Sequence, residues 1–287
     1  MAVTATMVKE LRDKTGAGFM DAKKALDQCE GDMEKAMEFL RQKGIASAEK
    51  KQDRIAAEGL VATYIENGVG AIVEVNCETD FVAKTDAFKE FVNGLAKHIA
   101  TTKPTDMDAL NASVCACCNM KIEDAVKDKI ATIGEKISIR RFEVLTGELA
   151  TYVHNGKIGV MISATAQDEV MLKDVALHIA SSAPEFVSRK EIPASVIEEE
   201  TRIEMGKEDL ANKPENIRAK IVEGRVNKLM AQKCLLEQPF VKNPDQTVEQ
   251  MLNGKLEIKS FVRWTLGEGL EKRQDNFAEE VMSQMVK

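Results

Sequence analysis

Apolar residues recur every three or four positions from Thr4 to Gly44, which is the spacing of amphipathic helices. Glycines interrupt this spacing in TGAGF, and Asp32 is suited to cap a further helix, so three short helices are predicted. So small a bundle buries little apolar surface and is expected to present a binding surface rather than an active site. The charged stretch SAEKKQDR, residues 47–54, is expected to be a helical extension or a linker. The apolar positions of the helices are Met7, Val8, Leu11, Met20, Ala22, Ala25, Leu26, Met33, Ala36, Met37 and Leu40.

The middle of the chain contains an internal repeat with a different pattern. Residues 59–75, GLVATYIENGVGAIVEV, and residues 147–164, GELATYVHNGKIGVMISA, both show a strand, an Asn-Gly turn and a second strand. LAKHIA at 95–100 returns as VALHIA at 175–180, each within a helical pattern. The predicted fold class is therefore α+β, with a core of two repeated α+β subdomains in which a helix covers one face of each sheet.

The two copies differ in length at one place. The interval from Asn76 to His98 is 22 positions, whereas the matching interval from Thr165 to His178 is 13. The nine extra residues fall around TDFVAKTDAF, after the strand AIVEV. A feature that occurs in one copy alone is not needed to build the unit. We therefore predict that Phe81 stands in an exposed turn for a function, and the alternative is that Phe81 folds back onto its own helix.

Residues 185–230 return to a helical pattern that is rich in charge. The stretch EIPASVIEEETRIEMGKEDL is broken by ANKP, and a second helix is predicted to follow Pro214, so the two form an antiparallel hairpin. LLEQPFVKN and EIKSFVRWTLG, which come later, are expected to form loop and strand elements. DNFAEEVMSQMVK is predicted to be a C-terminal helix and docking arm, with Phe277, Val281 and Met285 on one side. The predicted segments are 1–54 (bundle and linker), 55–140 (first core subdomain), 141–184 with 230–265 (second core subdomain), 185–229 (hairpin) and 266–287 (C-terminal module).

Composition and charge argue against a nucleic-acid-binding protein and against a membrane protein. The chain has 287 residues, 44% of them hydrophobic, and a formal net charge of −7, so it can bury a core and lacks the basic surface of a nucleic-acid-binding protein. No apolar run reaches the roughly 18 residues of a membrane span, and the first residues lack the apolar core of a signal peptide. A cytoplasmic location, without direct contact with nucleic acid or membrane, is expected.

Motifs for covalent catalysis are missing from the sequence. It contains no GxxxxGK[ST] loop and no HExxH, and GVGAIV lacks the third glycine of a dinucleotide site. His98 and His178 lie in apolar helical patterns and are predicted to be core or boundary residues and not ligands. His154, at the second Asn-Gly turn, is predicted to make a surface contact. The pattern is typical of a binding protein with several surfaces.

The cysteine cluster CACC allows two interpretations. Cys115 and Cys118 have the CxxC spacing of metal or redox sites, with Cys117 between them. A zinc site normally shows its ligands as two such pairs, and the remaining cysteines, Cys29, Cys77 and Cys234, are isolated. Reduced thiols on a helix are therefore expected.

Four stretches are similar to elongation factor Ts of bacterial type: MVKELRDKTGAGFMDAKKAL, EVNCETDFVAK, HNGKIGV and VEGRVNKLMAQKCLLEQPFV. They occur in the family's order, and the resemblance covers essentially the whole chain. It implies a guanine-nucleotide exchange factor for the translational GTPase elongation factor Tu, not an enzyme with a covalent step or a cofactor. It further implies an N-terminal bundle like a ubiquitin-associated domain that touches the GTPase domain, and a helical hairpin, or coiled coil, that emerges from the second subdomain.

Site residues follow from the same resemblance. It implies that Thr79, Asp80, Phe81 and Val82 intrude beside the nucleotide site of elongation factor Tu and dislodge its Mg²⁺. It implies partner contacts through Arg12, Met20 and Lys23 in the bundle and His154 in the second subdomain. Phe19 stands where many relatives have methionine, and the CACC cluster matches nothing in the family pattern.

Some alternatives stay open from the sequence. One is a coiled-coil scaffold without exchange activity, and another is a thiol enzyme or metal protein that uses Cys115 and Cys118. The sequence also leaves open whether two copies associate through the helical hairpin.

Overall fold

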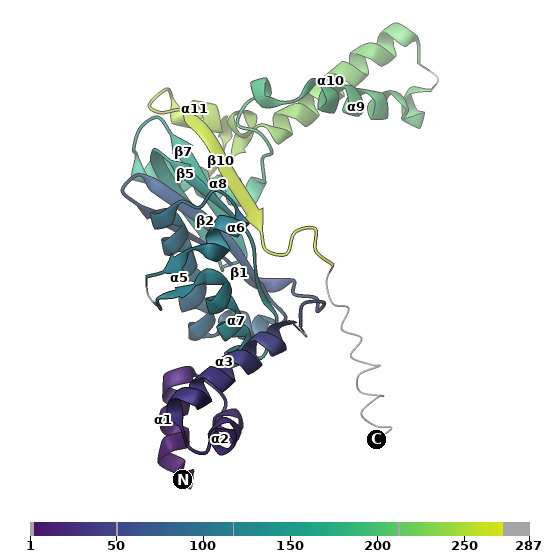
Figure 1. Cartoon of the computed structure of the whole chain (residues 1–287). Coiled ribbons are helices and arrows are strands. Elements are labelled where there is room, and N and C mark those ends of the chain that lie inside the picture. The colour runs from purple at the N-terminus through teal and green to yellow at the C-terminus, as the bar shows by residue number, and fades with distance from the viewer. Residues whose placement is uncertain (1–2, 50, 117, 212, 272–287) are drawn as a thin grey trace. The chain divides into compact units, whose positions relative to one another are not determined.

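The computed structural model describes residues 3–49, 51–116, 118–211 and 213–271. Over these residues the fold is mixed α+β, as predicted, with eleven α-helices and several small sheets (Figure 1). The chain divides into two compact units, one within Met1–Ala62, Val73–Glu143 and Thr265–Lys287 and the other within Thr63–Ile72 and Val144–Trp264. Among the described helices none has the length and apolar character that a membrane crossing requires.

The three predicted N-terminal helices are present. They are α1 (Ala5–Thr15), α2 (Phe19–Gln28) and α3 (Met33–Glu49). The Thr4 hydroxyl accepts the Met7 N–H to cap α1, and Gly16 ends it with a φ of 68°. Their shared core contains Val8, Leu11, Ala22, Ala25, Leu26 and Ala36. Helix α3 continues into the stretch predicted to be an extension or linker, because nothing in GIASAE stops it.

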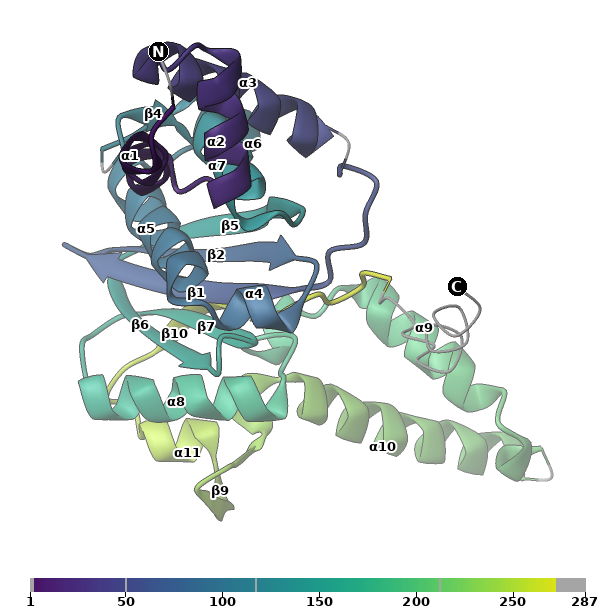
Figure 2. The ribbon, with the colours of Figure 1, turned by 90° about the horizontal axis from the view of Figure 1, so that it is seen from below.

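The first repeat forms a sheet with the strand order β1-β2-β5. Its strands are β1 (Glu58–Glu66), β2 (Val69–Cys77) and β5 (Ile137–Thr146). Asn67 and Gly68, with φ of 51° and 71°, make the two-residue turn between β1 and β2. Helices α4 (Asp80–Lys84) and α5 (Asp86–Thr102) follow β2, and Figure 2 shows α5 along this sheet. The connection to β5 contains α6 (Met107–Ala112), β3 (Val114–Cys115), β4 (Met120–Lys121) and α7 (Ile122–Ile133).

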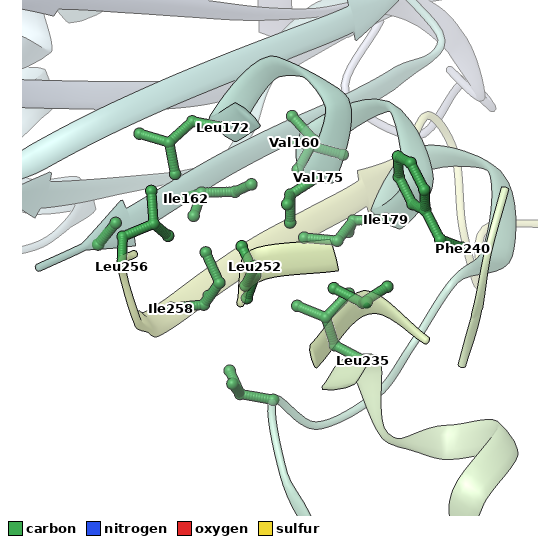
Figure 3. Packing of buried hydrophobic residues seen from close by; sticks show 14 of the residues in the cluster. Val160, Ile162, Leu172, Val175, Ile179, Leu235, Phe240, Leu252, Leu256 and Ile258 are labelled. Carbon is green, nitrogen blue, oxygen red and sulfur yellow. The ribbon is translucent and has the colours of Figure 1, made fainter. Parts of the chain in front are cut away.

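The second repeat has the matching strand order, β10-β7-β6. Strands β6 (Glu148–His154) and β7 (Ile158–Ala164) form an antiparallel hairpin, and β10 (Ile258–Thr265) pairs with β7 as β5 pairs with β2. Lys157 makes this turn one residue longer than its twin, and its N–H donates to the His154 carbonyl over 2.9 Å. Helix α8 (Glu169–Ser182) packs its apolar face on the sheet, and Figure 3 shows Leu172, Val175 and Ile179 against Val160 and Ile162.

The predicted helical hairpin interrupts the second repeat between α8 and β10. It consists of α9 (Ala194–Met205) and α10 (Glu215–Lys233), which lie side by side (Figure 1). Arg225 pairs with Glu204, and Lys233 with Glu200, so the helices are antiparallel. Six short elements complete the described chain: 3₁₀ turns at Arg189–Glu191, Glu208–Leu210 and Leu235–Glu237, the paired strands β8 (Pro239–Phe240) and β9 (Asn243–Thr247), and α11 (Val248–Leu252).

One sequence prediction lies outside the described residues, and another is wrong in part. The predicted C-terminal helix, with Phe277, Val281 and Met285, lies outside the described residues. The expectation that the CACC thiols lie on a helix was wrong for Cys115, which is in β3, because the β-branched Val114 begins a two-residue strand paired with β4. The domain boundaries drawn from the sequence stay a prediction.

Candidate functional site

The residues inserted into the first repeat form a short helix, not the turn that the sequence predicted. Thr79 is its N-cap, and the Thr79 hydroxyl accepts the Val82 N–H over 3.3 Å. Thr85 ends α4 and caps α5, because its hydroxyl accepts the Phe88 N–H over 3.3 Å. Two threonines thus fix both ends of a five-residue helix that is too short to be stable by itself.

Phe81 is the most exposed of the large apolar side chains in the described part of the chain, at 78%. The alternative that it folds back onto its own helix is therefore wrong. Lys84 lies 5.9 Å from the ring centroid and pairs with Asp80 over 2.5 Å, so one cation contacts both side chains. An exposed ring adds nothing to the core, so it is available for contact with another molecule.

The inner side of α4 is attached to the first unit. Ala83 is buried, and so is Cys77, whose thiol donates to the Thr79 carbonyl over 3.1 Å. Burial raises the pKa of the Cys77 thiol to about 12, so the group stays protonated and can donate this bond. The helix therefore presents Phe81 outward from a fixed base.

Glu135, which sequence reasoning missed, completes that base. Its carboxylate accepts the backbone N–H groups of Glu78 and Thr79 over 3.1 and 3.0 Å. It also accepts the Thr79 hydroxyl over 2.6 Å. Thr79 and Glu135 are 56 residues apart, and Glu135 follows α7 in the plain sequence GEK, so no local pattern pointed to it.

The predicted contact residues of the bundle are all on its surface. Met20 and Lys23 lie three positions apart on α2 and thus share a helix face. Met20 is 59% exposed and its neighbour Phe19 50%, which makes an exposed apolar pair. Arg12 lies on α1, is exposed, and pairs with Asp13 over 3.0 Å.

His154 is exposed at the end of β6, in the other compact unit from α4. The Tyr152 hydroxyl lies 3.1 Å from its Nδ1, and the two rings stack with centroids 6.2 Å apart. The Asn155 amide nitrogen lies 3.3 Å from Nε2. The arrangement has the geometry of an oriented surface contact.

The other two histidines are core residues, as predicted. His98 Nε2 lies 2.7 Å from the Ser113 hydroxyl, which itself donates to the Leu110 carbonyl. His178 Nδ1 accepts the Val241 N–H, so Nε2 carries the proton and donates to the Gln238 side chain over 2.8 Å. Burial lowers the pKa of both imidazoles, which keeps them neutral at pH 7.

The thiols give no support to a metal or redox site. Cys115 is buried and Cys118 exposed, while Cys117 lies outside the described residues. In the part of the chain that the structure describes, no three His, Cys, Asp or Glu side chains are grouped to bind a metal ion. A cavity of about 320 Å³ lies between the bundle and α7 and is lined by residues such as Lys43, Asp128 and Thr132.

A comparison with known proteins adds the decisive observation. The family model described as "Elongation factor TS" matches residues 78–268, which is more than half of the chain. The chain belongs to the elongation factor Ts family. As a member of that family it is a translation elongation factor that acts as nucleotide-exchange factor for elongation factor Tu, and not an enzyme in the usual sense. The match begins directly before Thr79 and thus includes α4, whereas Arg12, Met20 and Lys23 lie before it and their roles stay predictions.

Proposed function

We propose that this elongation factor Ts family member releases GDP by inserting Thr79, Asp80, Phe81 and Val82 beside the nucleotide site of elongation factor Tu, where they dislodge Mg²⁺. The observation that carries the proposal is the 78% exposure of Phe81 on a helix whose other side is fixed. The second repeat, which has the same strand order, lacks such a helix between β7 and α8 in the described residues.

The chemistry of the partner makes Mg²⁺ the sensitive point. A GTPase binds its nucleotide through backbone amides, a lysine and a Mg²⁺ that bridges the phosphates. Mg²⁺ requires near-ideal octahedral geometry, so a small displacement of the residues around it is costly. A rigid apolar side chain that enters there weakens GDP binding without forming any covalent bond.

Burial of Phe81 alone does not supply the free energy that nucleotide exchange requires. Binding of the factor and of GDP are coupled reciprocally, and a 10⁴-fold shift between two states corresponds to about 5.5 kcal/mol. Burying one phenylalanine supplies roughly 1.5–3 kcal/mol. We therefore assign the rest to other contacts: Arg12, Met20 and Lys23 on a bundle like a ubiquitin-associated domain, and His154 on the second repeat.

Cellular location and self-association belong to the same proposal. We propose that the factor works in the cytoplasm, and that the hairpin of α9 and α10 serves self-association as a coiled coil. The scaffold alternative without exchange activity gives no reason for an exposed Phe81.

The test is Phe81→Ala in the full-length protein. Release of labelled GDP from elongation factor Tu at saturating factor is expected to slow roughly 10- to 100-fold, the loss that corresponds to one buried ring. The thermal midpoint is expected to stay unchanged, because the ring is outside the core. Val170→Ala, which truncates a side chain 73% exposed on α8, is the matched control and is expected to exchange at the parent rate. Parent-like exchange by Phe81→Ala would refute the proposal.

A further inference from the structure

We propose that Glu135 is a positioning residue for nucleotide exchange, which fixes the direction in which α4 presents Phe81. The inference rests on the proposed function of residues 79–82. Its basis is a set of reciprocal hydrogen bonds between the segment after β2 and the segment before β5, defined here as the Glu78–Glu135 clamp.

One half of the clamp is made by the Glu135 carboxylate. One of its oxygens accepts both the Glu78 and the Thr79 N–H, and the other accepts the Thr79 hydroxyl. A carboxylate only accepts, so the Thr79 proton must point to Glu135. The lone pairs of the same hydroxyl are then free to accept the Val82 N–H and cap α4. Glu135 therefore sets the orientation of the capping group itself.

The other half of the clamp is made by the Glu78 carboxylate, which binds the backbone of the segment before β5. The Glu78 carboxylate accepts the Lys136 N–H over 2.6 Å and pairs with Arg54 over 3.2 Å. The Lys136 ammonium donates to the carbonyls of Gln52 and Arg54 over 2.6 and 2.9 Å. Each segment thus binds the other's backbone through a carboxylate, and the residues before β1 are attached to the same point. Both halves lie within one compact unit.

The second repeat shows that building the sheet does not require such carboxylates. The corresponding place in the second repeat lies between the end of β7 and the start of β10. There the Thr165 N–H donates to the Glu257 carbonyl over 3.0 Å. The Glu257 N–H donates to the Thr165 hydroxyl over 2.9 Å. The sheet is closed there without a carboxylate. The carboxylate clamp occurs in the repeat that contains α4.

The position of Phe81 explains why the clamp bears on exchange. Phe81 is the second residue of a five-residue helix, directly after the capped end. So short a helix has almost no stability of its own, and its first turn depends on the cap. Without the Glu135 bonds the first turn would sample other conformations, and each productive insertion would have to order it again. The expected loss is therefore in the rate of the bound complex, not in binding.

The experiment compares Glu135→Ala and Glu135→Gln with Glu123→Ala in the full-length protein. Glu123 is a matched control, since it is an exposed carboxylate of α7 bonded to Lys127. Glu135→Ala is expected to lower the maximal rate of GDP release about tenfold, equivalent to about 1.4 kcal/mol, with the half-saturating concentration unchanged within about twofold. Glu135→Gln keeps one carbonyl acceptor, so its maximal rate of GDP release is expected to lie between the rates of Glu135→Ala and the parent. Amide hydrogen exchange of residues 78–85 is expected to speed up in both variants, and the control to match the parent.

A cycle with Phe81→Ala separates the two proposals. If Glu135 acts through Phe81, adding Glu135→Ala to Phe81→Ala slows release no further. Independent losses from the two changes, or parent-like release by Glu135→Ala alongside slow release by Phe81→Ala, would overturn the role of Glu135 and leave the proposed function standing. Parent-like release by Phe81→Ala itself would overturn both. Should the alanine variant fail to fold, Glu135→Gln decides by the same comparison.

Discussion

At the scale of the single residue, Glu74 of β2 is the charge that the fold encloses most completely. It is fully buried, yet it pairs with Arg140 and Arg141 over 3.0 and 2.6 Å and accepts the Gly267 N–H over 2.9 Å. Burial by itself would raise the pKa of the Glu74 carboxyl, but the bonds from Gly267 and the two arginines outweigh it, so the pKa is lowered. Glu74 thereby attaches the residues after β10 to the strands of the first repeat.

We expect Glu74→Gln to lower the free energy of unfolding by about 3 kcal/mol at pH 7, because two partly buried guanidinium groups lose their partner. The folded pKa lies below the unfolded one, so this contribution is complete above the ordinary glutamate value of about 4.3 and is lost as the pH falls through the folded pKa. Denaturant unfolding from pH 7 down to about pH 3 checks this. The difference between parent and variant should shrink toward acid.

The matched control is Glu66→Gln, an exposed carboxylate at the end of β1. It is expected to change stability by less than about 0.5 kcal/mol at any pH. A Glu74→Gln difference that stays constant down to acid pH would contradict the assignment of that difference to the carboxylate charge.

At the scale of the element, the helical hairpin has a core of its own. Leu210 is fully buried against α10, where Val222, Val226 and Met230 are also buried. These residues form a cluster separate from the one under α8. An insertion with its own core can unfold locally without taking the sheet with it.

Leu210→Ala is therefore expected to cost the hairpin about 2–5 kcal/mol while leaving the sheet of the second repeat intact. Hydrogen exchange followed by mass spectrometry checks this, with faster exchange in α9 and α10 and unchanged protection in α8. Ile203→Ala, a truncation of a side chain 50% exposed on α9, should change neither. Equal loss of protection in α8 would show that hairpin and sheet unfold as one unit.

At the scale of the whole molecule, the proposed exchange activity is shared between several surfaces. Phe81 supplies at most about half of a 5.5 kcal/mol shift, so the remaining contacts must prefer nucleotide-free elongation factor Tu and not only bind it. Such a preference is a coupling free energy, which appears as a difference between two affinities.

The triple variant Arg12→Ala, Met20→Ala, Lys23→Ala tests the part assigned to the bundle. All three side chains are exposed, so the fold is expected to survive. Binding to nucleotide-free elongation factor Tu should weaken at least about tenfold more than binding to its GDP form, which corresponds to about 1.4 kcal/mol of coupling. Titration calorimetry on both forms measures this. Equal losses would make the bundle a tether, and the coupling would then lie in the two repeats.

Features that depend on local periodicity could be predicted from the amino-acid sequence. The three N-terminal helices, the strands on either side of Asn67-Gly68 and Asn155-Gly156, and the two helices around ANKP all follow from spacing, turn residues and breakers within a few positions. The length difference between the two copies also predicted that the segment around Phe81 has a function beyond building the fold. The family resemblance, supported by the match over residues 78–268, added the partner, while the contact residues that it implies stay predictions.

Contacts between residues far apart in the chain became visible in the folded structure alone. Thr79 meets Glu135 across 56 residues, and Glu74 meets Gly267 across 193, and neither pair leaves a periodic trace in the chain. The same holds for α4, whose five residues are helical because the cap and its carboxylate partner fix them, not because of propensity. Secondary structure is set mostly by neighbours in sequence, whereas the direction of a functional side chain depends on partners that only the folded chain brings together.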